Sequence, residues 1–334
     1  YYGGQYYAVF LTKLSFTRIQ ETYNLMRTLV AAFAFVLPFN LVFHMIREIP
    51  RKVKAVPGWI AALGALLAGA AVSLAGNMHY VLYGLFGDVF KLSGYEDYWF
   101  PNSTRYIGHN PLTDDQCIHE FPSYSFVLGD LHAHVVNVMF VLLTVGILYA
   151  WMKGIREREE EGQVFSVKKL LLEPAVIACG VLTGIFHWTN YWDFVIYTTA
   201  ALICIFFTAM YRYRGQAKAV AAATVLQTAE VFVLGTLAAL PFTSSFETMV
   251  SGIAFSKYHT VLYQFLILWG LPFALVLILL LAVLIKYLRA YRGPGRFREF
   301  FRRVSLSDTF ALILGICGIG LVLIPELIYV GDIY

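Results

Sequence analysis

Residues 58–76 read GWIAALGALLAGAAVSLAG, a stretch without a charged residue. A run of about 18 or more apolar residues is long enough to cross a bilayer as a helix. Several such runs occur in the 334 residues, of which 59% are hydrophobic and 14% are charged. Soluble domains carry about 25% charged residues. Backbone groups in lipid must bond within their own segment, so the sequence predicts an all-α, polytopic membrane bundle.

Eight apolar segments are expected to span the membrane. The first four lie at about 20–46, 57–76, 133–152 and 170–187. The fifth begins at a hairpin of residues 188–193 and runs to about 212, and the last three lie at about 219–240, 263–285 and 307–328. A short interfacial helix is expected before them, because residues 1–19 are rich in tyrosine. We interpret residues 1–334 as a single transmembrane domain, a fragment of a longer chain, with one long loop of short helices at 77–132.

Lysine and arginine are divided unevenly between the loops. The loops at 47–56, 153–169, 211–218 and 286–304 carry 19 of the 25 basic residues. All four fall on one side of an eight-span bundle, and the positive-inside rule places that side in the cytoplasm. The 77–132 loop is therefore expected on the extracytoplasmic side. The basic 286–304 loop is interpreted as an anchor to anionic lipid, not as a nucleic-acid site.

The stretch at 102–134, NSTRYIGHNPLTDDQCIHEFPSYSFVLGDLHAH, is polar and rich in histidine. Residues two apart share a face in an extended segment, so Asp130, His132 and His134 would converge there. One carboxylate and two imidazoles suit a divalent ion such as Mg, Mn or Zn. Glu120 is a candidate fourth ligand or base, which makes Glu120 and Asp130 the catalytic candidates. The alternative is a polar cap on the next span, and in a helix the three side chains would fan apart.

Further candidates lie at 99–105, at the beginning of this stretch, and in the 187–193 segment later in the chain. Arginine suits bidentate binding of phosphate, and aromatic rings suit the faces of sugars. The alternatives are an internal salt bridge for the arginine, ordinary interfacial tryptophans, and a helix cap for the aspartate of the 188–193 hairpin. The substrate-binding candidates are Arg105, Trp99, His187, Asn190, Trp192 and Asp193.

Several motifs resemble those of an uncharacterised prokaryotic membrane family that is marked by a Tyr-Tyr-Tyr signature. The motifs are Tyr1-Tyr2, Leu11-Thr12-Lys13-Leu14, the central Glu120–His134 stretch, Asn190–Asp193 and Pro325–Tyr329. The third tyrosine of the signature is missing here or lies upstream of Tyr1, and Gly331 stands where a basic residue is expected. The layout of this family is similar to that of the C-type superfamily of membrane glycosyltransferases.

This resemblance implies a glycosyltransferase of a prokaryotic cell membrane, whose partners are membrane lipid and a polyprenyl-phosphate-linked sugar donor. The key acid of the first outer loop would then precede Tyr1. The alternative function is non-enzymatic: a lipid or solute transporter, or a scaffold subunit of an envelope complex. A transporter would need a polar path across the membrane, and a scaffold would bury its outer face against a partner.

Overall fold

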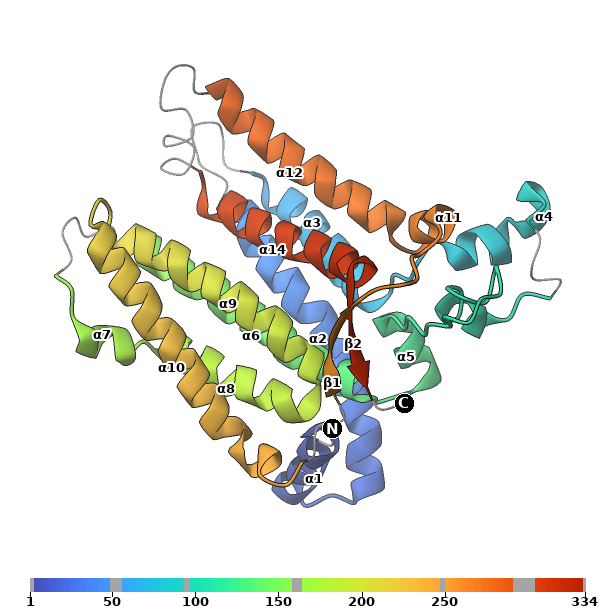
Figure 1. Ribbon diagram of the computed structural model, residues 1–334, viewed down its shortest axis with the longest axis horizontal. Helices are drawn as coiled ribbons and strands as arrows, with labels where there is room; N and C mark the ends of the chain where they lie inside the picture. Colours follow the sequence, from blue (N-terminus) through green and yellow to red (C-terminus); the bar gives the residue numbers. More distant parts are fainter. Residues whose placement is uncertain are drawn as a thin grey trace. The chain divides into compact units, whose positions relative to one another are not determined.

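The computed structural model describes residues 3–48, 56–92, 97–157, 164–246, 250–290 and 304–332. Helices dominate this part of the chain (Figure 1). The tyrosine signature at Tyr1 and Tyr2 and most of the basic 286–304 loop lie outside the described residues.

All eight predicted spans are helical, and the chain is a multi-pass membrane protein. Six helical segments of the described chain are long and apolar enough to cross a membrane. They are α2 (Ile19–Arg47), α6 (Ala133–Glu157), α9 (Tyr191–Arg212), α10 (Ala217–Thr243), the α11–η3–α12 segment (Leu262–Ala290) and α14 with η4 (Leu306–Glu326). The other two, α3 (Gly58–Ser73) and α8 (Pro174–Thr189), are shorter apolar helices. A short helix, α1 (Gly3–Ser15), precedes them, and α2 continues through Pro38.

The chain forms two compact units that alternate along the sequence. The first comprises Tyr1–Val72, Gly129–Glu247 and Ser305–Leu314, and the second comprises Ser73–Leu128, Thr248–Val304 and Gly315–Tyr334. The predicted loop at 77–132 therefore falls mainly in the second unit. That the two units act as one domain stays a prediction from the sequence.

Within the first unit, α6 is the most buried of the candidate spans and packs against α2, α8 and α9. Helices α8 and α10 also pack closely, and a Cβ on Gly184 would lie 2.5 Å from the Gly235 carbonyl oxygen. Small residues permit such close helix packing in lipid. At the other end of α8, the Arg212 guanidinium bonds the Glu173 carboxylate at 2.7 Å, which ties α9 to the beginning of α8.

The second unit contains the short elements of the polar loop. They are the π-helix η1 (Tyr80–Leu85), α4 (Gly87–Phe90), the 3-10 helix η2 (Phe100–Thr104) and α5 (Pro122–Leu128). The Asn77 amide donates to the Ser103 carbonyl at 2.7 Å, and the Ser123 hydroxyl donates to the Ala75 carbonyl at 3.1 Å. These bonds join distant parts of the loop, so the loop is a folded segment held by its own contacts.

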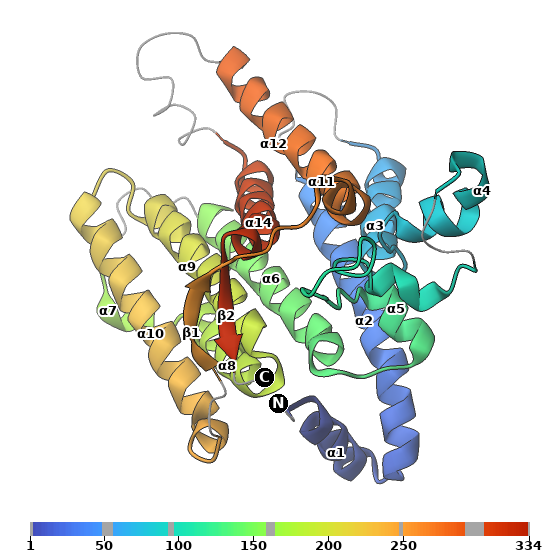
Figure 2. The same cartoon turned by 45° about the vertical axis from the view of Figure 1, so that its right-hand side comes forward.

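The second unit also contains a two-stranded sheet that the sequence did not predict. Strand β1 (Val250–Phe255) pairs antiparallel with β2 (Ile328–Asp332), with Ala254 opposite Tyr329 (Figure 2). Each strand is short, and its partner lies more than 70 positions away in the sequence. The pairing therefore leaves no local signal, and the chain remains almost entirely helical.

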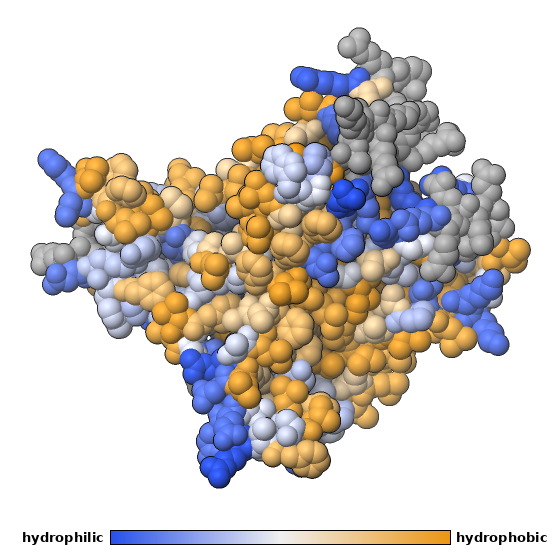
Figure 3. Space-filling model, turned by 180° about the vertical axis from the view of Figure 1, so that it is seen from behind, coloured by the Kyte–Doolittle hydropathy of each residue, from blue (hydrophilic) through white to orange (hydrophobic). Residues whose placement is uncertain are grey.

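Hydrophobic side chains cover much of the face in Figure 3. In α12 (Leu271–Ala290), the side chains of Leu275, Ile278 and Leu281 are all more than half exposed. An exposed apolar helix of this length is stable in the hydrocarbon of a bilayer and is costly in water.

Candidate metal and substrate site

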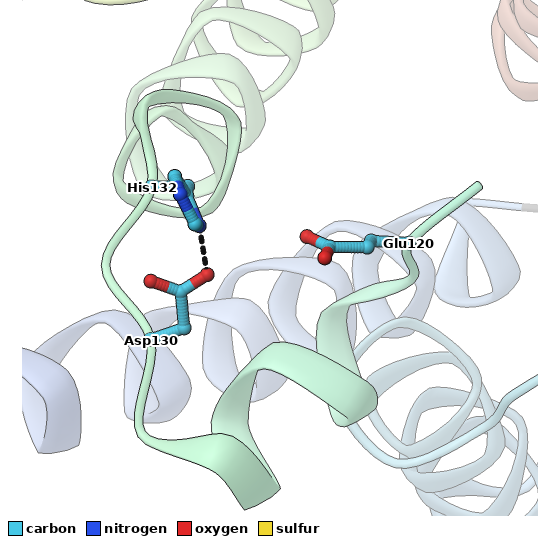
Figure 4. Close-up of side chains that lie close together, drawn as sticks. All are labelled: Glu120, Asp130 and His132. Atoms are coloured by element: carbon cyan, nitrogen blue, oxygen red, sulfur yellow. Dashed lines mark hydrogen bonds and ion pairs between the residues drawn. The ribbon is translucent and has the colours of Figure 1, made fainter. Parts of the chain in front are cut away.

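The segment Gly129–His132 joins α5 to α6 and carries the central candidate residues. Gly129 follows α5 with φ of +70°, a left-handed conformation that favours glycine and commonly ends a helix. Helix α6 begins at Ala133, so Asp130 and His132 lie on non-helical backbone. Alternate residues of such a segment share a side. The Asp130 carboxylate meets the Nδ1 atom of His132 (Figure 4).

This pair has the geometry of a partial metal site. The Asp130 side chain is 27% exposed and the His132 side chain is 69% exposed, so a solvated ion can reach both. Each residue offers one ligand atom, and the two atoms face each other. A cation placed between the two ligand atoms would be held by one oxygen and one nitrogen. Mixed oxygen and imidazole ligands suit Mn or Zn better than Mg, which prefers oxygen alone.

The other two predicted ligands are placed differently. His134 lies in the first turn of α6, and its ring stacks on that of His132 with centroids 6.0 Å apart and planes 8° apart. Glu120, labelled in Figure 4, lies two residues before α5 and belongs to the second unit. The structure brings Asp130 and His132 together, and the participation of His134 and Glu120 stays a prediction.

A polar network lies where α6, α8 and α9 meet in the first unit. The Asp193 carboxylate accepts hydrogen bonds from the amides of Asn137, at 2.6 Å, and Asn190, at 2.8 Å. The Thr189 hydroxyl donates to the side-chain Oδ1 atom of Asn137 at 2.8 Å. His134 is close enough to Asp193 for an electrostatic interaction. The predicted Asn190 and Asp193 therefore meet in a network of three helices. Asn190 occupies the N-cap position of α9, and its side chain bonds Asp193 instead of the backbone of the helix.

Arg27 is a charged residue of the same unit that the sequence analysis did not select. It lies in α2, and a Cβ added to Gly129 would overlap its guanidinium group. Its Nη1 atom donates to the Asn24 side chain at 3.1 Å. The available signal was that Arg27 is the one charged residue between Glu21 and His44 in an apolar segment. The sequence analysis also did not select Asn137, because a single amide side chain in an apolar span does not indicate which residues it will bond.

Arg105 lies in the second unit and bonds to hydroxyl groups. Its Nη1 atom donates to the Thr104 hydroxyl at 3.1 Å and to the Tyr124 hydroxyl at 3.2 Å. Among the residues that the structure describes, no ion pair of Arg105 appears, so the alternative of a salt bridge has no support here. Hydroxyl partners leave the positive charge uncompensated, which is compatible with anion binding.

Two histidines lie in the interior of the second unit. Burial lowers the pKa of His79 to about 4, with a smaller contribution from His119. Burial also lowers the pKa of His119 to about 4, and the charges of His109 and Arg105 act in the same direction. The His79 ring stacks on Tyr83 and meets Tyr106 edge-on, with centroids 4.6 Å apart in each pair. Both imidazoles are therefore neutral at physiological pH, and His79 is part of an aromatic core.

The remaining candidates are Trp99, His187 and Trp192. The side chains of Trp99 and Trp192 are 66% and 56% exposed. The His187 ring packs on Phe194 with centroids 3.9 Å apart, and on Tyr191. The two tryptophans are thus available to a ligand or to the membrane interface, whereas His187 is engaged in aromatic packing.

Comparison with known proteins gives one match. The family model described as an uncharacterized membrane protein family (DUF2298) covers residues 1–305. No curated protein and no solved structure matches the chain. The family match agrees with the apolar helices and spans both the Asp130–His132 pair and the Asp193 network. The chain belongs to the uncharacterised membrane protein family DUF2298.

Proposed function

We propose that this protein is a membrane glycosyltransferase that takes a sugar from a polyprenyl phosphate at the extracytoplasmic side of a prokaryotic membrane. The observation that carries the proposal is the contact between Asp130 and His132 on the segment that leads into α6. Ionisable groups within membrane-spanning segments mark functional sites by default, and this pair lies directly before such a segment. The uneven distribution of lysine and arginine between the loops supports placing this site on the extracytoplasmic side.

In this proposal Asp130 and His132 would hold a divalent cation. His134 would be a further ligand of the ion or would donate a hydrogen bond to the phosphate of the substrate. Such an ion would stabilise the negative charge that develops on the leaving phosphate. The donor set fits, because carboxylate oxygen and imidazole nitrogen are ordinary ligands of Mn and Zn.

Glu120 is the proposed general base. Only the seven residues of α5 and two others separate it from Asp130, and seven helical residues rise by about 10 Å. The proposal assigns both carboxylates to one substrate because they are close in the sequence. The acceptor hydroxyl oxygen forms a bond to the anomeric carbon while the bond from that carbon to the phosphate oxygen breaks. Polyprenyl phosphate leaves with the electron pair, and Glu120 takes the hydroxyl proton.

Arg105 and the exposed tryptophans supply binding groups in the proposal. A guanidinium that bonds only to hydroxyls among the described residues retains the charge needed to attract phosphate. The exposed rings of Trp99 and Trp192 offer apolar faces for a sugar. The Asp193 carboxylate, held by two amides, is a fixed acceptor for sugar hydroxyls.

A transfer assay with polyprenyl-phosphate sugars and the purified protein tests the proposal. The wild type should transfer sugar in the presence of Mn²⁺, and a Glu120→Ala, Asp130→Ala double variant should lose at least 100-fold in rate, in line with the usual contribution of a base. Asp114→Ala is the matched control, because it removes an exposed carboxylate from the same loop. Full activity of the double variant would eliminate the assignment.

A further inference from the structure

Arg27 is a charge within an apolar helix. It lies eight residues after the start of α2, which corresponds to about 12 Å along the helix axis. No other charged residue occurs from Thr22 to Phe43. An arginine at such a position is expensive unless it is paired or meets a ligand.

The backbone of the candidate site is shaped around this guanidinium. Gly129 directly precedes Asp130, and the Arg27 guanidinium occupies the space in which a Cβ of residue 129 would lie. The φ of +70° at Gly129 holds the chain in this arrangement. The contact places Arg27 beside the segment that carries the Asp130–His132 pair, and both belong to the first unit.

The guanidinium uses little of its hydrogen-bonding capacity. An arginine has five N–H donors. Within the described residues, the hydrogen bond from Nη1 to Asn24 is the one that Arg27 makes, and no carboxylate forms an ion pair with it. Asn24 is neutral, so this bond orients the group without compensating its charge. The half-buried side chain therefore retains both a positive charge and donors for an anion.

We propose that Arg27 binds the phosphate of the lipid substrate through its guanidinium fork. The identity of the lipid in this inference rests on the proposed function. The presence of an anion site at Arg27 does not depend on it. A planar fork matches two phosphate oxygens. The position of Arg27 in an apolar span suits a phosphate with an alkyl chain better than free phosphate, because the chain can remain in the hydrocarbon.

Binding of dodecyl phosphate to the detergent-purified protein tests this inference. Dodecanol supplies the chain without the phosphate, and inorganic phosphate supplies the anion without the chain. The wild type should prefer dodecyl phosphate to both by tenfold or more. Arg27→Gln should weaken dodecyl phosphate binding by at least tenfold, and Arg27→Lys by less, since it keeps the charge and loses the fork. Arg18→Gln removes an exposed arginine just before α2 and should change affinity less than twofold.

Unchanged affinity in Arg27→Gln, or a wild type that does not bind dodecyl phosphate, would overturn the inference. A fall in the unfolding temperature of Arg27→Gln with unchanged affinity would show a structural role instead. Stronger binding of inorganic phosphate than of dodecyl phosphate would contradict the lipid assignment. The result is independent of the transfer assay: dodecyl phosphate binding through Arg27 without sugar transfer would support this inference and refute the proposed function.

Discussion

The substitution Asn137→Ala removes the amide that joins three helices of the first unit. Asn137 is fully buried, donates to the Asp193 carboxylate at 2.6 Å and accepts from Thr189 at 2.8 Å. A hydrogen bond to a charged group contributes roughly 1.5–3 kcal/mol and a neutral one roughly 0.5–1.5 kcal/mol. Asp193 keeps its bond from Asn190, so we expect a loss of about 3 kcal/mol in the free energy of unfolding.

This loss should appear as a lower unfolding temperature in detergent. For a unit of about 200 residues, 1 kcal/mol shifts the midpoint by about 2–4 °C, so we expect a decrease of about 6–12 °C. Thr199→Ala is the matched control, because Thr199 is exposed on α9 and its one side-chain hydrogen bond within the described part of the chain goes to the Val195 carbonyl of its own helix. If the two variants unfold at the same temperature, the buried network does not hold these helices together and our reasoning fails.

Three other perturbations follow from the described contacts. Gly129→Ala combines a strained left-handed φ with overlap of the Arg27 guanidinium, so binding of dodecyl phosphate should fall at least fivefold in an affinity measurement. The pKa of buried His79 is about 4, below its unfolded value of about 6.5. The contribution of neutral His79 to the free energy of unfolding should therefore be complete above pH 6.5 and fall toward pH 4, by about 3 kcal/mol at most. His79→Phe should flatten the measured profile of stability against pH, and an unchanged profile would show that His79 is not the cause of the fall. Glu173→Gln leaves the nearly buried Arg212 without its carboxylate and should reduce the free energy of unfolding by about 3 kcal/mol, whereas equal stability of the variant would show that the pair contributes nothing.

The helices could be predicted from the sequence because their signal is local. Long runs of mostly apolar residues mark the spans, and all eight predicted spans are helical where expected, to within a few residues. The β1–β2 pair could not be predicted, since it joins residues 250–255 to residues 328–332 and lies in segments without strand-like alternation. Its formation depends on the fold of the second unit.

The candidate site was predictable only where its geometry is local. Asp130 and His132 meet because two positions separate them on non-helical backbone. His134 belongs to α6, and the residue at which a helix begins is the least certain feature of a sequence prediction. The roles of Arg27 and Asn137 arise from the packing of α2 against Gly129 and of α6 against α9. Such contacts leave no pattern in the sequence of either helix.

Binding of Mn²⁺ to the purified protein, measured by electron paramagnetic resonance, tests the central claim most directly. We expect wild-type protein to bind the ion, and Asp130→Ala and His132→Ala each to weaken binding at least tenfold, because each removes one of two facing ligand atoms. His259→Ala, which removes an exposed histidine of the second unit, should leave binding unchanged. Equal Mn²⁺ binding by wild type and both site variants, or no binding by the wild type, would contradict the account.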